Sequence, residues 1–421
     1  MKTINALIIG SGGREYALAW KISQSKHINK FFSINGSDGI KKFAKLLPTN
    51  WKNFEDVLKI CRKEEIDLVV IGPEEPLVLG LSDFLRSHNI NVFGPSQEGA
   101  KIESSKKFTK ILCDEMKIPT AKYESFDDLE KLSNYIKQQK KFPIVLKYDG
   151  LAAGKGVKIS NDLPNALNDA KELFNSYTSN FKIVVEEFLE GHELSFFAIT
   201  DGNVTKKLAV AQDHKRAYDE DKGENTGGMG VISGNFLINS ELEKKIMTQI
   251  IEPTIQYFKK HNISYRGVLF AGLMIDKNNN PHLIEYNARF GDPETEAICM
   301  RIEDDILELM YKASIEKLDN KEIKISNKTA ICVVLASNGY PGEYKKNIPL
   351  GKLPKCSKHS KIFHHGTTLK DKEWHSNGGR VLSINILGDS VQEIRKKAYD
   401  KLKKINWSEG FYRSDIGKKH E

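Results

Sequence analysis

Cysteine is scarce in this chain of 421 residues. The five cysteines form no C-x-x-C pair; they are Cys61, Cys113, Cys299, Cys332 and Cys356. Disulfide frameworks and small zinc sites need closely spaced, paired cysteines, so the sequence argues against both and favours a reducing compartment.

Long apolar runs are also missing. The run near the start, Ala6–Ile9, is far shorter than the roughly 20 apolar residues that span a bilayer, and it ends in a glycine loop. We interpret it as a buried strand rather than a signal peptide or membrane anchor, and we expect a cytoplasmic protein with no membrane partner.

No dense block of one charge occurs, and no internal repeat or low-complexity tract. Lys and Arg number 64 against 56 Asp and Glu, but the lysines are scattered in pairs such as Lys41–Lys42 and Lys403–Lys404. Such pairs are typical of solvated helix faces, which argues against a nucleic-acid partner. The formal net charge of +8 would still favour phosphorylated substrates.

What the chain does contain is a regular alternation of strand and helix patterns over its first hundred residues. The expected strands are Ala6–Ile9, Phe31–Ile34, Ile66–Ile71 and Val92–Phe93, with helices at Arg14–Ser23, Phe54–Glu64 and Leu81–Ser87. This rhythm predicts a parallel, Rossmann-like sheet with helices on both faces. Ligands bind such sheets at the carboxyl ends of strands, where three glycine-containing turns lie.

A second unit begins near Ser104, which with Ser105 can cap a helix that ends before Pro119. Further strands are expected at Ile144–Leu146, Val157–Ile159, Ile183–Val185, Leu194–Ile199, Leu208–Ala211, Val268–Ile275 and Pro281–Tyr286. From about Ala330 the pattern indicates an α+β cap with strands Ile331–Leu335 and Arg380–Ile386 and a helix near Val391–Lys404.

The first glycine loop, Gly10–Glu15, is open to three interpretations. A dinucleotide fingerprint would need a third glycine at Glu15 and an acid after the second strand, where Asn35–Gly36 stands instead. Backbone amides with Arg14 would suit a phosphate, and a purely structural turn is the remaining alternative.

The second glycine loop lies between two strands, at Lys147–Val157. It is one residue short of a Walker A motif, and Gly156 takes the place of the Ser or Thr that would hold magnesium. We expect a hairpin lid over phosphates. Lys147 ends an otherwise apolar strand, so it is either a phosphate ligand or an edge-strand lysine, and Lys106 in the first turn of its helix supports the first option.

Two segments rich in acidic residues follow. Val184–Ser195 is either a hinge that contacts a nucleotide base and ribose or a salt-bridged acidic turn. In Pro281–Thr295, strand alternation places Glu285, Asn287 and Arg289 on one face. Carboxylate and amide oxygens suit Mg²⁺, and an arginine beside them suits a transferring phosphoryl group; a chance surface strand is the alternative.

A last glycine-rich loop, Glu224–Gly230, follows the basic segment Gln212–Arg216. We expect an anion site there, or a mobile loop. His364–His365 and the cysteines are interpreted as structural, and no Ser/His/Asp or Cys/His set is predicted.

Taken together, these motifs resemble the phosphoribosylamine–glycine ligase family of the ATP-grasp superfamily, essentially from end to end. The resemblance is carried by Gly12–Glu15, Gly72–Glu74, Ser105–Lys110, Asp149–Val157, Gln212–Arg216, Asn225–Gly230, Phe290–Thr295 and Asn377–Val381. It implies an α/β and α+β multidomain protein: a Rossmann-like substrate domain (1–104), an ATP-grasp small lobe with the hairpin lid (105–190), a large lobe with the metal site (191–327) and a C-terminal α+β domain (328–421).

The resemblance also implies a reaction. ATP would phosphorylate the carboxylate of glycine, and the amine of 5-phosphoribosylamine would displace the phosphate to give glycinamide ribonucleotide in de novo purine biosynthesis. Besides these three small molecules we expect a magnesium or manganese ion, and a monomer or weak homo-oligomer.

The site residues carried over from the family form four sets. The implied ATP contacts are Lys106, Lys147, Gly154, Lys155, Gly156, Glu186, Glu187, Phe188, Leu189 and Glu193. The implied substrate contacts are Gly12, Gly13, Arg14, Asp213, Lys215, Asn225, Thr226, Gly227, Gly228, Met229, Gly230, Arg289, Gly291, Asp292, Pro293 and Glu294. Glu285 and Asn287 would bind the metal, and Lys147, Arg289 and Asp292 would act in catalysis.

Two rival functions remain open on the sequence. Another ATP-grasp enzyme would activate bicarbonate and would not need Asn225–Gly230, and a non-catalytic nucleotide-binding regulator would be expected to lose Lys147, Glu285 or Asn287. An oxidoreductase is the weakest alternative, because of the first glycine loop.

Overall fold

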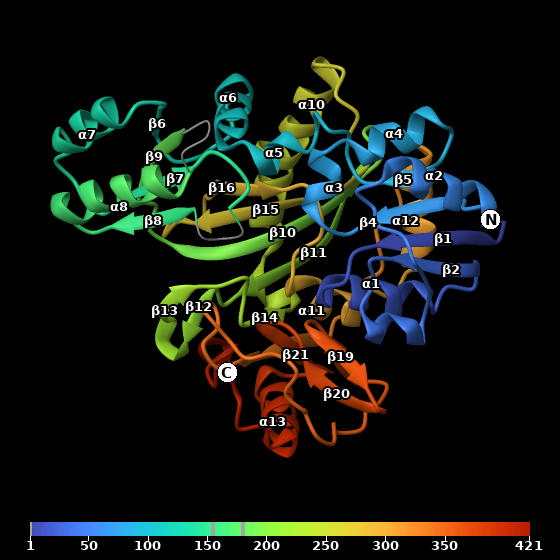
Figure 1. Ribbon diagram of the computed structural model, residues 1–421. Helices are drawn as coiled ribbons and strands as arrows, with labels where there is room; N and C mark the ends of the chain where they lie inside the picture. Colours follow the sequence, from blue (N-terminus) through green and yellow to red (C-terminus); the bar gives the residue numbers. More distant parts are fainter. Residues whose placement is uncertain (1, 153–155, 178–181) are drawn as a thin grey trace.

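A computed structural model describes residues 2–152, 156–177 and 182–421. Three peripheral parts surround a long central sheet: the N-terminal α/β part, a small lobe around α7 and α8, and the C-terminal part around α13 (Figure 1). No helix among the described residues is long and apolar enough to cross a membrane.

The N-terminal part confirms the predicted parallel sheet. Its strands are β1 (Ile4–Ile9), β2 (Ile28–Ile34), β3 (Lys45–Leu47), β4 (Leu68–Ile71) and β5 (Val92–Phe93), in the order β3-β2-β1-β4-β5. The helices are α1 (Gly13–Ile22), α2 (Phe54–Lys63), α3 (Glu74–Val78) and α4 (Leu81–Ser87). Every residue of β1 is buried, as expected for a central parallel strand. Helix α3 was missed because Gly72–Pro76 was interpreted as a turn only.

The small lobe has its own sheet and its own hydrophobic core. Strands β6 (Tyr123–Phe126), β7 (Ile144–Tyr148), β8 (Val157–Ser160) and β9 (Ile183–Glu187) form an antiparallel sheet in the order β6-β9-β7-β8. Helices α7 (Leu129–Lys137) and α8 (Leu163–Ser176) cover it. The expected hairpin β7–β8 is present. Before the lobe lie α5 (Lys101–Ser104) and α6 (Lys106–Met116), and α6 is capped by the Ser105 hydroxyl as predicted.

The central sheet is antiparallel and continues into the C-terminal part. Its order is β16-β15-β10-β11-β14-β17-β21-β18. The bounds are β10 (His192–Thr200), β11 (Thr205–Asp213), β14 (Gly230–Ser233), β15 (Gly267–Ile275), β16 (Pro281–Asn287), β17 (Thr329–Ser337), β18 (Ser360–His364) and β21 (Arg380–Gly388). The main strands of the expected C-terminal cap therefore extend the sheet of the core rather than forming a sheet of their own, because β14 pairs with β17.

Short elements complete these parts. The hairpin β12 (Arg216–Tyr218) and β13 (Lys222–Asn225) stands beside the central sheet, and β19 (Thr367–Lys370) pairs with β20 (Glu373–Ser376) near the C-terminal helix α13 (Val391–Leu402). Strand β22 (Gly410–Phe411) pairs with β17. Helices α9 (Ser240–Ile246) and α10 (Glu252–Lys260) precede β15, and α12 (Ile306–Ser314) packs near β4 and β5.

Helix α11 (Glu294–Arg301) lies where the parts meet. All of its residues are buried, and it packs on α1, β11, β14, β17 and β21. Because side chains alternate along a strand, Phe196 joins the core shared with α10, whereas Phe197 joins the core shared with α1 and α11. Helix α11 is thus held by α1, by the central strands β11 and β14 and by the C-terminal strands β17 and β21. Its first turn lies next to the carboxyl end of β16.

Candidate functional site

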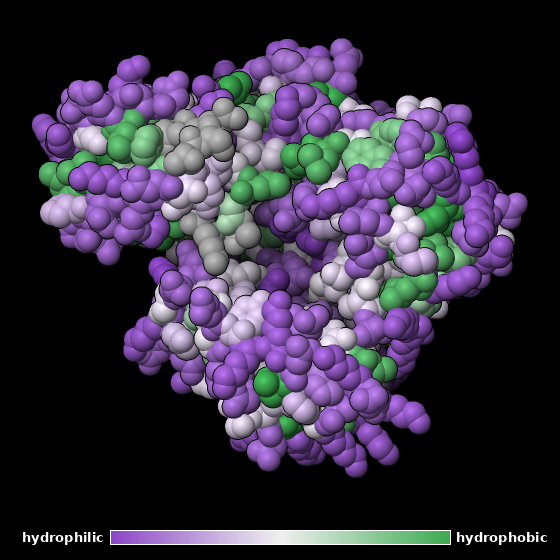
Figure 2. All heavy atoms as spheres, viewed as in Figure 1, coloured by the Kyte–Doolittle hydropathy of each residue, from purple (hydrophilic) through white to green (hydrophobic). Residues whose placement is uncertain are grey.

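Small side chains form the floor of the candidate site. Ala211, Ser195, Gly272 and Glu285 follow one another across strands β11, β10, β15 and β16, each paired with the next. Directly paired residues of an antiparallel sheet share a face, so the three small residues and the Glu285 carboxylate lie in a row on the same face. In Figure 2 the space-filling surface is hollowed at the centre, with hydrophilic residues inside. The floor leaves room for a ligand above the sheet.

The two predicted metal ligands lie on β16, at one end of this floor. Burial alone would raise the pKa of the Glu285 carboxyl, but the positive charges of Lys215, Lys147, Lys106 and Arg289 lower it below its usual range. In the part of the chain that the structure describes, this carboxylate accepts no hydrogen bond. An ionised carboxylate beside the Asn287 amide fits a hard cation such as Mg²⁺ or Mn²⁺. The strand ends at Asn287, so Arg289 stands two residues beyond it rather than on it.

A buried network of two lysines and one glutamate, from α6 and the small lobe, faces β16. Lys147 Nζ lies 2.9 Å from Glu186 Oε2 and donates to the Ile284 carbonyl oxygen at 3.1 Å. Lys110 Nζ lies 3.2 Å from Glu186 Oε1. The Glu186 carboxylate is therefore engaged by the lysines rather than free to contact adenine. Lys110 was missed, although its i,i+4 spacing from Lys106 on α6 was a signal.

The N-terminus of α6 contacts the turn that follows β7. Lys106 Nζ donates to the Gly150 carbonyl oxygen at 3.0 Å, and the Lys107 backbone N–H donates to Asp149 Oδ1 at 3.2 Å. Burial lowers the pKa of Lys106. These two hydrogen bonds join the turn after β7, which carries Lys147, to the N-terminus of α6. Of the predicted lid contacts, Gly154 and Lys155 lie outside the described residues, and the Gly156 carbonyl oxygen accepts the Tyr148 N–H at 2.8 Å.

The predicted base and ribose contacts follow β9. Glu187 exchanges hydrogen bonds with the backbone of Lys122, which joins it to the β6 edge. Phe188 is 38% exposed, which is high for a phenylalanine. Glu193 Oε2 lies 2.8 Å from Lys215 Nζ. The segment from Glu187 to Leu189 therefore lies at the surface, as a hinge contact needs, whereas Glu193 has the ion pair of the alternative interpretation.

Arg289 is held by two acids from distant parts of the chain. Its Nη2 lies 2.7 Å from Glu103 Oε1 and its Nε lies 3.3 Å from Glu74 Oε2, so α3 and α5 both contribute. Burial raises the pKa of Glu103, whereas Arg289 and Arg14 lower that of Glu74 against the effect of burial. The guanidinium is pre-oriented, which matters for a group that has to meet a substrate carboxylate or phosphoryl group in a fixed direction.

Two carboxyl groups, Asp213 and Glu294, form an acidic pair beside this arginine. Burial, together with the neighbouring Glu294, raises the pKa of Asp213 well above its usual value. Burial likewise raises the pKa of Glu294, whose Oε1 accepts the Ser195 hydroxyl at 3.2 Å. Asp213 Oδ1 is buried without a hydrogen-bond partner among the described residues. The positive charges of Lys215, Arg289 and Arg380 oppose these shifts without offsetting the effect of burial, so a cationic group of a substrate would be stabilised at the pair.

The glycine-rich loop Asn225–Gly230 packs on the turn before α11. The Gly227 N–H donates to Tyr340 Oη at 3.0 Å, the Gly228 N–H donates to Thr226 Oγ1 at 3.0 Å, and the Met229 N–H donates to the His214 carbonyl oxygen at 2.9 Å. Gly228 has φ = 109°, and a Cβ there would overlap with Pro293 Cδ. The loop and the turn at Pro293 are therefore one packed unit.

Asp292 joins this turn to the first glycine loop. The Arg14 N–H donates to Asp292 Oδ2 at 3.1 Å, and Arg380 Nη2 lies 2.9 Å from Asp292 Oδ1. Burial opposes ionisation, but Arg380 and the other neighbouring cations hold the pKa of Asp292 well below its usual range. Gly291, the residue before it, accepts the Thr295 hydroxyl through its carbonyl oxygen.

The predicted phosphate seat at Gly12–Arg14 is partly occupied by the protein itself. The Gly12 N–H donates to Glu15 Oε2 at 2.6 Å, and the Arg14 side chain contacts Glu15 Oε1 at 2.5 Å and the Phe290 carbonyl oxygen at 3.2 Å. The Arg14 guanidinium is therefore directed inward, and its role in the structure is to join α1 to the end of β16.

Comparisons with known proteins cover nearly the whole chain. Family models for phosphoribosylglycinamide synthetase match at residues 4–103 (N domain), 104–295 (ATP-grasp, A, domain) and 330–419 (C domain). Phosphoribosylamine–glycine ligase of Rhizobium meliloti (strain 1021) is 45% identical over 416 residues, and that of Vibrio vulnificus (strain CMCP6) is 42% identical over 420 residues, each covering 98% of both chains.

Solved structures give the same picture. A crystal structure of phosphoribosylamine–glycine ligase from Thermotoga maritima is 32% identical with a TM-score of 0.87, covering 98% of this chain and 100% of that one. The biotin carboxylase domain of Hydrogenobacter thermophilus 2-oxoglutarate carboxylase, determined with MgADP and bicarbonate, has a TM-score of 0.76 at 13% identity over 98% of this chain and 92% of that one, which shows a shared fold only. This chain therefore belongs to the phosphoribosylglycinamide synthetase family of ATP-grasp enzymes.

Proposed function

We propose that this protein joins glycine to 5-phosphoribosylamine to give glycinamide ribonucleotide in de novo purine biosynthesis. A carboxylate oxygen of glycine attacks the γ-phosphorus of ATP, and ADP leaves. The amine nitrogen of 5-phosphoribosylamine then attacks the acyl carbon of glycyl phosphate, phosphate leaves, and the amine gives up a proton. The observation that carries the proposal is that buried lysines from β7 and α6 meet the Glu285–Asn287 strand, in a chain of this family: Lys147 donates to the Ile284 carbonyl oxygen, and Lys147 and Lys106 lower the pKa of Glu285.

ATP would lie between the small lobe and β16. Lys106 and Lys147 would bind its phosphates, with the lid at Gly154–Gly156 above them. The surface segment from Glu187 to Leu189 would contact adenine, and Glu193 would contact the ribose after release from Lys215. Glu186 has a different part here: it holds Lys147 and Lys110 in place.

Glu285 and Asn287 would hold one or more divalent ions, Mg²⁺ or Mn²⁺, at the phosphate end. Their oxygen donors and the lowered pKa of Glu285 fit that cation class. A bound ion would neutralise charge on the transferring phosphoryl group. The lysines and the pre-oriented Arg289 supply the remaining positive charge without reorganisation, which is the main catalytic resource in phosphoryl transfer.

Glycine would bind between Arg289 and the Asp213–Glu294 pair. The arginine would face its carboxylate, and the acidic pair would accept its ammonium group. An ammonium between these carboxyls would favour their ionised forms and relieve the raised pKa values that burial gives them. The Gly228 loop packs closely over Asp213, so the space between this pair and Arg289 would admit only a small amino acid.

Phosphoribosylamine would bind on the side of glycine opposite ATP, against Asn225–Gly230, Gly291–Pro293 and the loop before α1. Lys215 would face its phosphate, and Asp292 would hold the first turn of α1 in place through the Arg14 N–H. The protein would act on these small molecules in the cytoplasm as a monomer or weak homo-oligomer, with no nucleic-acid or membrane partner.

The test is an omission experiment on the purified protein. With MgATP, glycine and freshly made phosphoribosylamine, ADP and glycinamide ribonucleotide should appear in equal amounts, and omission of either glycine or phosphoribosylamine should remove the product. Bicarbonate in place of glycine should give no added ADP release. Bicarbonate-stimulated ADP release without a response to glycine would refute the proposal and favour an ATP-grasp carboxylase.

A further inference from the structure

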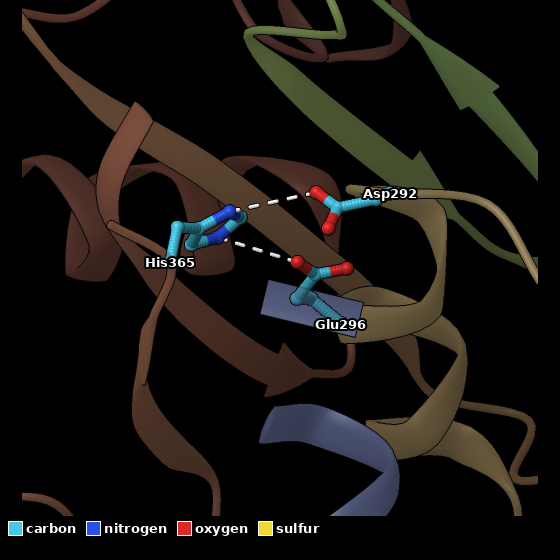
Figure 3. Close-up of side chains that lie close together, drawn as sticks. All are labelled: Asp292, Glu296 and His365. Atoms are coloured by element: carbon cyan, nitrogen blue, oxygen red, sulfur yellow. Dashed lines mark ion pairs between the residues drawn. The ribbon is translucent and has the colours of Figure 1, made fainter. Parts of the chain in front are cut away.

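A histidine lies between a partly buried and a fully buried carboxylate, where the N-terminal part, the central sheet and the C-terminal part meet (Figure 3). His365 Nδ1 is 3.5 Å from Asp292 Oδ1, and His365 Nε2 is 3.2 Å from Glu296 Oε1. His365 belongs to the segment between β18 and β19, whereas Asp292 lies in the turn before α11 and Glu296 in the first turn of that helix. The C-terminal part thus places one imidazole ring between two acids of the core.

Glu296 and His365 are closed off from water, whereas the Asp292 side chain is 14% exposed. Glu296 is fully buried and His365 is 4% exposed, and neither carboxylate oxygen of Glu296 has a hydrogen-bond partner among the described residues. Gly13 of α1 covers the pair, since a Cβ there would overlap with Glu296 Oε1 and His365 Cε1. A buried carboxylate is costly unless it is paired, and the imidazole is the group placed to pair with it.

A metal ion does not fit this group, although the three ligand atoms lie within 4.8 Å of one another. The two ring nitrogens face different carboxylates, so one ion could take only one of them. Arg380 already pairs with Asp292: its Nη2 lies 2.9 Å from Asp292 Oδ1, and its Nη1 donates to the Asp292 carbonyl oxygen at 2.7 Å. A cation there would lie against a guanidinium.

We propose that His365 is a positioning residue that prevents Glu296 from displacing Asp292. Asp292, in the turn before α11, and Glu296, in its first turn, are four residues apart, and the imidazole separates them. Without it, two buried carboxylates would face each other directly. Asp292 is the more exposed of the two and the one able to turn, at the expense of its contacts with Arg380 and the Arg14 N–H.

The consequence would be specific to one substrate. The Arg14 N–H is the point where Asp292 holds the loop before α1, and the proposed function places phosphoribosylamine, not ATP, against that loop. This inference therefore rests on the proposed function. Loss of His365 should weaken phosphoribosylamine binding and leave glycyl phosphate formation intact.

The experiment uses the full-length protein with His365→Ala, Glu296→Gln and the double variant. The exposed His359→Ala serves as the matched histidine control. Michaelis constants are measured for ATP, glycine and phosphoribosylamine. The first half-reaction is followed separately by trapping glycyl phosphate with hydroxylamine, whose nitrogen attacks the acyl carbon and releases phosphate, so that phosphoribosylamine is not needed.

We expect His365→Ala to raise the KM for phosphoribosylamine about tenfold, as for a buried charged group that loses its partner, with the trapping rate within twofold of wild type. Glu296→Gln alone should stay within twofold, because an amide can still pair with Nε2. The double variant should return to within twofold, because the carboxylate that displaces Asp292 is gone. An unrescued double variant, or equal losses in both half-reactions, would overturn the proposal.

The test does not depend on folding of the single variant. If His365→Ala does not fold, the double variant still should, and it supplies the reference for histidine-selective ¹⁵N NMR of the wild type. A ring N–H signal protected from exchange in the wild type and missing from the double variant supports the arrangement; a rapidly exchanging ring would overturn it. Wild-type turnover that lacks glycine dependence would instead refute the proposed function itself.

Discussion

Lys147→Met is the most informative single substitution in the proposed ATP site. The Lys147 side chain is 4% exposed and its ammonium has two partners in the protein, Glu186 at 2.9 Å and the Ile284 carbonyl oxygen at 3.1 Å. Methionine keeps the length of the stem and removes the charge. A buried, fixed cation aimed at a phosphoryl group is a preorganised donor, whose loss costs on the order of 3 kcal/mol, or about 150-fold in the rate of phosphoryl transfer.

The same substitution leaves Glu186 with Lys110 as its remaining ionic partner, at 3.2 Å. Losing one partner of a buried charged group destabilises the folded protein by about 1–3 kcal/mol. The two effects can be separated with Lys147→Met/Glu186→Gln, which removes the unpaired charge: the free energy of unfolding should recover, whereas the rate should not. Lys158→Met, at a partly exposed lysine on β8 of the same hairpin, is the matched control.

The assay is a single turnover with hydroxylamine trapping, at ATP concentrations above saturation, beside urea unfolding of each variant. A rate for Lys147→Met within threefold of wild type corresponds to less than about 0.7 kcal/mol and would refute the role of this lysine. A double variant that regained both stability and rate would show that Lys147 serves only to neutralise Glu186.

Three further predictions follow from the geometry of the site. Glu285→Gln should raise the Mg²⁺ concentration needed for half-maximal activity at least tenfold, measured by metal titration; an unchanged midpoint would contradict the metal assignment. Because burial raises the pKa values of Asp213 and Glu294, these carboxyls take up protons as the pH falls, and a protonated carboxyl no longer pairs with an ammonium group. The KM for glycine should therefore rise as the pH is lowered, and Asp213→Asn should raise it at all pH values and flatten the slope; equal profiles would argue against the ammonium site. Gly228→Ala should destabilise the protein by about 1–3 kcal/mol in urea unfolding, because of φ = 109° and the overlap with Pro293, and a change below 0.5 kcal/mol would contradict the packing of this loop.

The elements that local sequence patterns specify were predictable. The glycine turns followed by helices, the hairpin on either side of Gly150 and the strand that carries Glu285 all follow from patterns within about ten residues. The position of Lys147 at the end of an apolar strand was visible in the same way.

Pairings between distant segments were not predictable from the sequence. Glu186 stands in an acidic segment that suggested base contacts, and only the tertiary structure brings Lys110 and Lys147 to it. Arg289 meets Glu74 and Glu103 in the same way. The C-terminal strands were interpreted as a separate unit because pairing of β14 with β17 depends on register across a hundred residues.

The proposed chemistry depends on one arrangement: lysines from the small lobe and a metal on β16 enclose the same triphosphate. A crystal structure with a non-hydrolysable ATP analogue, Mg²⁺ and glycine tests it directly. The β- and γ-phosphates should lie above Gly272, within hydrogen-bond distance of Lys106 or Lys147, and the ion should be bound by Glu285 and Asn287. Phosphates bound elsewhere, or an ion held by other residues, would contradict this arrangement.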